Sequence, residues 1–221
     1  MSVYLLPLAV FLKNMEPVYS NNKYKPISRL KIAENIYKTS IDGLLYCSHN
    51  THSDSRGFFS EIGRVPEVES VIGAAFPIKQ ISHARSNKNV IRGFHGENWA
   101  KYVQVVSGKC FSAVADVRPE SVTFLNVEIF ILGQGEGTLD GSLYIPPRLG
   151  NSMCVLDGPV DYIYLFNQLY SLRDVSGDVA ISLFDNDLGV EWPISKEEMI
   201  ISERDKNSVT LREQYPEAFQ N

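Results

Sequence analysis

The fold of this chain is indicated most clearly by residues 101–117, KYVQVVSGKCFSAVADV. In its second half, the side chains expected to face a core, Phe111, Ala113 and Ala115, alternate with side chains expected to face outward. A period of two along the chain is typical of β-strands. The stretch therefore predicts two strands, 101–106 and 110–117, joined by a tight hairpin at Ser107-Gly108-Lys109.

Similar short apolar runs, separated by Gly, Asn, Asp and Pro, continue along the chain from residue 41. The clearest further strands are expected at 125–132, 141–145, 153–156 and 160–166. Helical patterns are few: a possible short helix around residues 30–37 and a last helical turn at 196–200. Closely spaced strands with so few helices predict an all-β antiparallel sandwich or barrel.

The length of 221 residues allows one large β domain. We expect an N-terminal extension over residues 1–40, the β domain over 41–195 and a helical or irregular tail over 196–221. The extension carries an apolar run, residues 3–12 (VYLLPLAVFL), which is too short to span a bilayer and lacks the flanks of a secretory signal. We expect it to pack on the domain or on a partner subunit, with no membrane contact.

Composition narrows the classes of function. Hydrophobic residues make up 44% and charged residues 21%, which are ordinary values for a soluble globular protein. A net charge of −5 argues against nucleic-acid binding, because no surplus of Lys and Arg is present to contact phosphates. The three cysteines have neither metal-ligand spacing nor an even number, so reduced thiols and a cytoplasmic location are expected.

The sharpest local motif is Arg92-Gly93-Phe94-His95-Gly96, in which two glycines flank a histidine just before a strand. Such a histidine can be presented into a cavity, although the pentapeptide alone favours an ordinary turn residue. Three further segments complete a pattern with it when taken in order. The four segments are 55–61 (SRGFFSE), 80–95 (QISHARSNKNVIRGFH), 101–118, and 143–193 with LYIPP, DYIYLFNQLY and FDNDLGVEWP.

Together these segments resemble the dTDP-4-dehydrorhamnose 3,5-epimerase family over about residues 41–194. The resemblance implies a cupin-type antiparallel jelly roll and a homodimer. It implies an epimerase that inverts C3, C5 or both in a nucleotide-diphosphate 4-keto sugar, with no metal and no redox cofactor. A hydrogen next to a ketone becomes removable when an enolate can form, so the reaction needs a base, an acid and a group that stabilises the enolate oxygen.

The resemblance also implies residue roles. His95 corresponds to the general base, Asp185 to the carboxylate that orients its imidazole, and Tyr164 to the acid on the opposite face. Lys101 corresponds to the lysine near the C4 oxygen. The expected substrate-binding residues are Arg56, Phe59, Glu61, Gln80, Arg92, Asn151 and Tyr170. Considered singly, Tyr164 would be a core aromatic, Asp185 a turn residue and Lys101 an edge-strand lysine.

Three departures from the family pattern leave the substrate open. Asn151 stands where the family has a second histidine, the loop 96–100 (GENWA) is short, and Ser82 replaces an asparagine. Asparagine can hydrogen-bond a substrate oxygen but carries no charge. The short loop and the Gly-Asn-Ser turn resemble a branch that acts on GDP-linked keto-heptoses. The nucleotide, the sugar and the number of inverted centres are therefore undetermined.

Other functions remain possible on this fold. A 4-keto sugar ketoisomerase would move a proton between neighbouring carbons on one face. A non-catalytic nucleotide-sugar binder would need the arginines but not the acid and base. A metal-dependent cupin would need several converging ligands, for which only Glu97 and Asp116 are candidates beside His95.

Overall fold

Two long strands organise the structure, a computed structural model that describes residues 23–220. β7 (Lys101–Asp116) and β10 (Leu149–Phe166) pair antiparallel along nearly their whole lengths. Each half of each long strand also pairs with a shorter strand on its other side. These partners are β8 (Val127–Gly133) and β9 (Gly141–Ile145) on β7, and β5 (Gln80–Ser86) and β6 (Val90–Gly96) on β10.

The predicted hairpin at residues 107–109 is wrong, because β7 runs through these residues as one bent strand. Its two halves pair with the two halves of β10 and not with each other. Gly108 has φ = +81°, and a Cβ there would lie 2.7 Å from the carbonyl oxygen of Pro159. A glycine within a strand pattern can mark a bend as well as a turn. Here the bend lets both long strands curl the sheet around a common interior.

The other strands extend this curled sheet at its edges. They are β1 (Ile36–Lys38), β2 (Leu45–Ser48), β11 (Val179–Ile181) and β12 (Ile200–Ile201). The sheet order is β1-β2-β9-β7-β10-β6-β11, and only the pairing of β12 with β6 is parallel among the paired strands of residues 23–220. The all-β antiparallel class is thus confirmed. The strands predicted from residue 110 to residue 166 are found, with 153–156 and 160–166 forming parts of β10.

Helices are few and short. The helix predicted around residues 30–37 is wrong: the 3-10 turn η2 (Ser28–Leu30) precedes β1, whose Ile36 is buried against the sheet. Tertiary pairing overrides a weak helical pattern there. Helix α1 (Val65–Ile72) is an element that the sequence patterns do not predict. The remaining helical elements are η3 (Tyr170–Leu172), η4 (Lys196–Glu198) at the predicted turn, α2 (Glu203–Lys206), α3 (Leu211–Gln214) and η5 (Pro216–Phe219).

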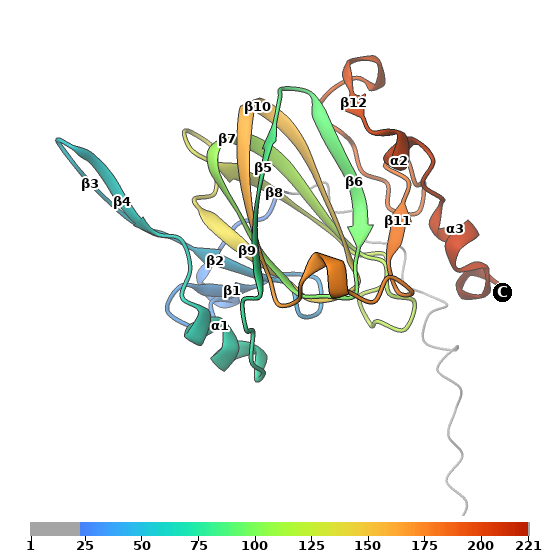
Figure 1. The fold of residues 1–221 in the computed structure, drawn as a ribbon, viewed down its shortest axis with the longest axis horizontal. Coiled ribbons are helices and arrows are strands. Elements are labelled where there is room, and N and C mark those ends of the chain that lie inside the picture. The colour runs from blue at the N-terminus through green and yellow to red at the C-terminus, as the bar shows by residue number, and fades with distance from the viewer. Residues whose placement is uncertain (1–22, 221) are drawn as a thin grey trace, which may run out of the picture.

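The apolar side chains form two main layers. An inner cluster fills the curled sheet and includes Val103, Leu143, Met153 and Tyr162. An outer cluster lies on the other face of β6, β7 and β8, where the C-terminal elements cover it (Figure 1). The division into extension, domain and tail stays a prediction. Parts of both flanking segments contact the β domain: β1 pairs with β2, and the C-terminal elements pack on the outer cluster.

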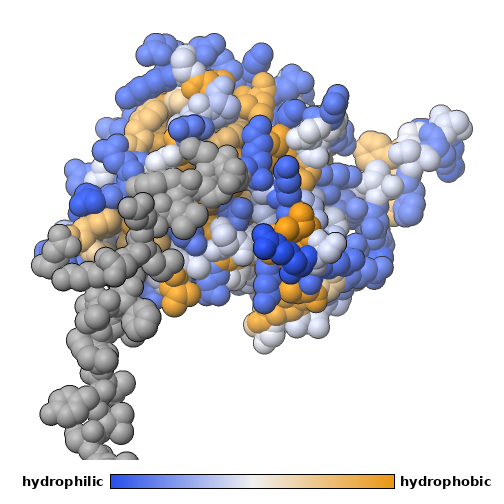
Figure 2. Space-filling model, turned by 180° about the vertical axis from the view of Figure 1, so that it is seen from behind, coloured by the Kyte–Doolittle hydropathy of each residue, from blue (hydrophilic) through white to orange (hydrophobic). Residues whose placement is uncertain are grey.

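One hairpin stands apart from this body. β3 (Asn50–Asp54) and β4 (Gly57–Glu61) form a separate two-stranded sheet that projects from the molecule (Figure 1, Figure 2). Phe58 and Phe59 on this arm are 61% and 70% exposed. The apolar run at residues 3–12 lies outside the described residues. Within residues 23–220, no helix has the length and apolar character needed to cross a membrane.

Candidate active site

A bulge in β6 places His95. His95 pairs with Asn151, and Arg92 pairs with Met153. The two pairs are three residues apart on β6 but only two residues apart on β10, so β6 contains one extra residue. A bulge changes which face the following side chains occupy. Asn151 shares its face of β10 with Leu149 and Met153, which belong to the inner cluster. As the cross-strand neighbour of Asn151, His95 also lies on the inner face.

The imidazole of His95 contacts a carboxylate from the C-terminal segment. Its Nε2 lies 2.6 Å from Oδ1 of Asp205 in α2. The second oxygen, Oδ2, accepts hydrogen bonds from the Gly93 N–H at 3.2 Å and the Ser202 hydroxyl at 2.9 Å. A Cβ on residue 93 would lie 2.9 Å from Oδ1 of Asp205, so glycine there lets the carboxylate approach. Four polar groups thus form a fixed unit.

Asp205, and not the predicted Asp185, is therefore the carboxylate on His95. Asp185 is buried and accepts hydrogen bonds from the backbone N–H groups of Asp187, Leu188 and Leu211. It holds a turn and the start of α3. The interaction of His95 with Asp205 joins residues 110 positions apart, beyond the reach of local patterns. The sequence marks Asp205 only through Ser202, three residues earlier, because the two form a helix-capping pattern in the predicted tail.

The electrostatics of the pair determine its protonation. Burial acts to raise the pKa of Asp205, but the hydrogen bond and charge of His95, with the Gly93 N–H and the Ser202 hydroxyl, hold it below its usual value. The carboxylate is therefore ionised at neutral pH. Nε2–H of His95 then donates to Asp205, and Nδ1 is the ring nitrogen that can accept a proton.

Lys101 lies on the same inner face. It begins β7 two residues before Val103 of the inner cluster, and only 3% of its surface is exposed. Its Nζ donates to the carboxylate of Glu97 and, at 3.3 Å, to the backbone oxygen of His95. The ammonium group is thus adjacent to the histidine.

Tyr164 faces the interior from β10, opposite Val103. Its ring stacks on Phe166 at a centroid distance of 5.5 Å and lies 4.8 Å from the ring of Tyr162. Burial raises the pKa of Tyr164 to about 12, with Arg92 acting in the opposite direction. The phenol therefore carries its proton at neutral pH and can serve as a donor.

Asn151 adds an unpartnered acceptor. It is 9% exposed, and its Oδ1 is buried without a hydrogen-bond partner in the part of the chain that the structure describes. An unsatisfied buried oxygen is costly. A ligand hydroxyl or a water molecule beside His95 would satisfy it.

Some predicted binding residues lie near this site. Gln80 of β5 accepts a hydrogen bond from the Tyr170 N–H at 2.8 Å, so the two are held together. The Tyr170 ring is exposed and lies 3.9 Å from the guanidinium of Arg173. Arg92 donates from Nε and Nη2 to the Ser86 hydroxyl at 3.1 and 3.0 Å. An exposed ring suits stacking on a nucleobase, and a guanidinium such as that of Arg92 suits a phosphate.

The other three predicted binding residues lie on the projecting arm. Arg56 pairs with Asp54 at 2.6 Å, its side chain 88% exposed, and Phe59 is also exposed. Glu61 pairs with Arg64 at 2.6 Å. The arm points away from the body (Figure 1), so the single chain does not bring these residues to His95.

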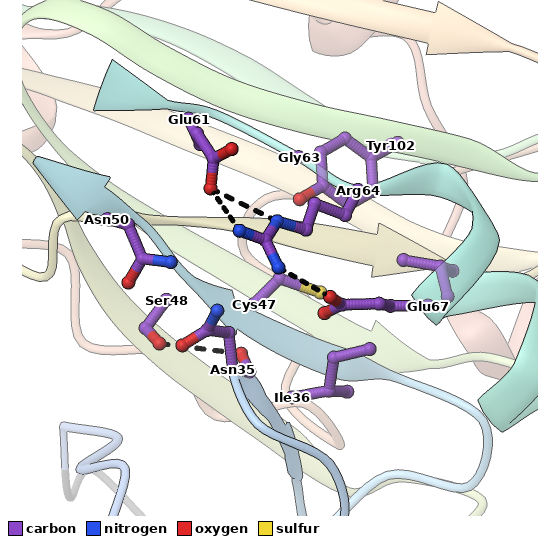
Figure 3. Close-up of a pocket in the computed structure, with 11 residues that line it drawn as sticks. Asn35, Ile36, Cys47, Ser48, Asn50, Glu61, Gly63, Arg64, Glu67 and Tyr102 are labelled. Atoms are coloured by element: carbon purple, nitrogen blue, oxygen red, sulfur yellow. Dashed lines mark hydrogen bonds and ion pairs between the residues drawn. The ribbon is translucent and has the colours of Figure 1, made fainter. Parts of the chain in front are cut away.

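A pocket at the base of the arm is not the substrate site. Arg64 lies there between Glu61 and Glu67, near Cys47 and Tyr102 (Figure 3). The volume of this pocket is about 20 Å³, enough for about one water molecule. The ion pairs fasten the arm to α1. Among residues 23–220, no three His, Cys, Asp or Glu side chains are grouped to hold a metal ion.

The chain is similar to known sugar-nucleotide epimerases. Residues 38–213 match the family model described as dTDP-4-dehydrorhamnose 3,5-epimerase, a match that includes Asp205. A dTDP-4-dehydrorhamnose 3,5-epimerase of Shigella flexneri is 30% identical over 178 residues, covering 78% of this chain and 93% of the relative. A dTDP-4-dehydro-6-deoxyglucose 3-epimerase of a Streptomyces species is 30% identical over 180 residues, covering 80% and 88%.

Solved structures show the same likeness. A 3,5-epimerase from Legionella pneumophila in complex with dTDP-4-keto-L-rhamnose aligns with a TM-score of 0.73 and 27% identity, covering 85% of this chain and 99% of that chain. A 3'-monoepimerase from Streptomyces bikiniensis in complex with dTDP-quinovose aligns with a TM-score of 0.71 and 30% identity, covering 80% and 89%. With the antiparallel strand order, these likenesses confirm the predicted fold class.

Proposed function

Because this chain belongs to the dTDP-4-dehydrorhamnose 3,5-epimerase family, we propose that it is an epimerase of a nucleotide-diphosphate 4-keto sugar of the dTDP-4-dehydro-6-deoxyhexose type. The reaction serves deoxysugar, surface polysaccharide or glycoconjugate biosynthesis. The observation that carries the proposal is the His95–Asp205 pair, on the face that also bears Lys101 and Tyr164. No redox step is required, because a proton leaves a carbon and returns to it.

The proposed reaction moves one proton at a time. Nδ1 of His95 removes the proton from the carbon next to the C4 ketone, and the C–H electron pair forms the enolate. Lys101 stabilises the negative charge on the enolate oxygen, and Asp205 stabilises the imidazolium. Tyr164 then donates a proton to the opposite face of the same carbon, which inverts the centre. The phenolate regains a proton from solvent, and His95 releases its own.

The relatives leave the number of inverted centres open, since they include 3,5-epimerases and 3-epimerases. Retention of both a base and an opposite acid favours an epimerase over a non-catalytic binder, because binding alone needs neither. A ketoisomerase, which works on one face, would have less need of Tyr164. A metal-dependent cupin would be revealed by metal analysis of the purified protein.

We expect the protein to exchange solvent deuterium into C3, C5 or both of its substrate. The test incubates the enzyme in heavy water with a panel of dTDP- and GDP-linked 4-keto sugars, hexoses and heptoses included. Mass spectrometry and NMR would report which centre gains deuterium and whether it inverts. A wild-type protein that exchanges no deuterium into any member of the panel would contradict the proposed function.

We further propose a cytoplasmic homodimer in which the β3–β4 arm reaches the site of the neighbouring subunit. The arm carries Arg56, Phe59 and Glu61 away from the His95 of its own chain, and its exposed phenylalanines would be covered in a dimer. The three buried, unpaired cysteines are compatible with a reducing compartment.

This arrangement predicts complementation between two variants. We expect Arg56→Ala and His95→Ala homodimers to be impaired separately, and mixed subunits to regain activity. In a hybrid dimer, one site combines the intact His95 of one subunit with the intact Arg56 of the other. Light scattering would measure the mass of the wild type. A monomer at micromolar concentration, or no gain in activity after subunit exchange, would contradict the proposal.

A further inference from the structure

Glu97 is a largely buried carboxylate beside Lys101, and the proposed reaction assigns it no task. It lies just past β6, and its side chain is 15% exposed. Its backbone oxygen accepts a hydrogen bond from the Arg148 N–H at 2.8 Å, which fixes the loop that carries it. The carboxylate forms an ion pair with Lys101, whose side chain is 4% exposed. Such a buried ion pair is weak evidence for a role in stability, because the cost of desolvating both charges offsets much of their attraction.

The charges around Glu97 come from four elements. Lys101 of β7 pairs with it directly, while His95 of β6, Arg204 of α2 and Tyr164 of β10 interact with it through space. Burial acts to raise the pKa of Glu97, but the charge and hydrogen bond of Lys101, with His95 and Arg204, hold it below its usual value. Glu97 is thus a stable anion at neutral pH and a poor proton acceptor.

The hydrogen bonds of Lys101 show what this anion does. A lysine ammonium has three N–H donors. Within residues 23–220, one donates to Glu97 and one to the backbone oxygen of His95. These two acceptors fix the position of Nζ beside the histidine, and the third N–H points elsewhere. A flexible side chain is thereby held in one orientation before substrate binds.

We propose that Glu97 is a positioning residue for Lys101: its carboxylate holds the buried ammonium in place and directs the third N–H toward the C4 oxygen of the substrate. The inference rests on the proposed function and extends it to a residue outside the acid–base set. Without the Glu97 carboxylate, Lys101 would lose its counterion and one of the two acceptors that fix its Nζ. A loosely held ammonium stabilises an enolate poorly, because its position is no longer set before the reaction.

The variant that tests this is Glu97→Gln, which keeps the size of the side chain and removes its charge. We expect kcat to fall about tenfold to a hundredfold. Removal of a preorganised donor typically costs ~10²–10³-fold, and here the donor Lys101 is retained but held less firmly. KM should stay within about threefold, because the phosphate contacts are unchanged. A fall in kcat at constant KM would indicate that the donor is lost in the transition state and not in substrate binding. Glu97→Asp, which retains the charge, should recover part of the rate.

The matched control is Glu128→Gln. Glu128 is also largely buried, but it accepts hydrogen bonds from the N–H and hydroxyl of Ser40. Its strand, β8, is separated from the β6 strand of His95 by β7 and β10. The Glu128→Gln variant should alter thermal stability without changing kcat. An unchanged kcat in Glu97→Gln, beside an active wild type, would overturn the inference and leave the proposed function intact. A loss of rate that follows only the loss of folded protein would also overturn it. An inactive wild type would contradict the proposed function, and the inference with it.

Discussion

Replacement of His95 by alanine is expected to abolish deuterium exchange and epimerisation together. The imidazole on the inner face, held by Asp205, is the group assigned to remove the carbon proton. Loss of a positioned proton-transfer group costs about 10²–10⁴-fold in rate, and loss of the base leaves the later steps without their enolate. The measurement is deuterium uptake at C3 and C5 with the substrate identified from the panel.

A matched control separates this effect from damage to the fold. His83→Ala removes a histidine that also pairs with an aspartate, Asp161 at 2.8 Å, but on an exposed part of β5. It should keep wild-type exchange. An active His95→Ala variant would contradict the mechanism.

Tyr164→Phe should behave differently from His95→Ala. The base still forms the enolate, so deuterium should enter with retention of configuration, while inversion slows severely. Full epimerase activity in Tyr164→Phe would assign the acid to another group.

The second large effect is expected from Asp205→Asn. The carboxamide keeps the shape but can donate its own N–H to Nε2 of His95, which would place the proton on Nδ1, the nitrogen that must be free to act as base. The imidazolium would also lose its anionic partner. The comparable change in a serine protease triad lowers kcat by about 10⁴-fold, which we take as the upper limit for this arrangement. We expect a loss of about 10²–10⁴-fold in kcat.

Asp185→Asn is the informative comparison for Asp205→Asn. Asp185 accepts three backbone hydrogen bonds that hold a turn and the start of α3, so its replacement should lower thermal stability. The kcat of the folded fraction should stay near that of the wild type. Thermal unfolding and kcat, measured on both variants, distinguish the two aspartates. The opposite result, a slow Asp185→Asn and a normal Asp205→Asn, would contradict the assignment made from the structure.

Much of the fold is encoded in short-range patterns. The alternation along residues 110–117 predicts a strand, because the side-chain period of a strand follows from local backbone geometry. Both faces of this strand are buried, however: Phe111, Ala113 and Ala115 belong to the outer cluster, and Val114, expected to face outward, belongs to the inner cluster. Apolar runs bounded by turn residues predict the strands around 127–133 and 141–145. The ordered motifs around Arg56, His95 and Lys101 likewise predict the family, because each motif is contiguous in the chain.

Contacts between distant segments were decided only by the tertiary structure. The alternation on both sides of Gly108 fits either a hairpin or one bent strand, and the partner strand β10 decides in favour of the bend. The partner of His95 is another such choice. Asp185 and Asp205 are both buried carboxylates. The capping pattern of Ser202 predicts a helix start at Asp205, but it does not show which carboxylate reaches His95. The parallel pairing of β12 with β6 brings α2 beside the bulge. Because glycine has no Cβ, Gly93 leaves room for Asp205 to contact the imidazole.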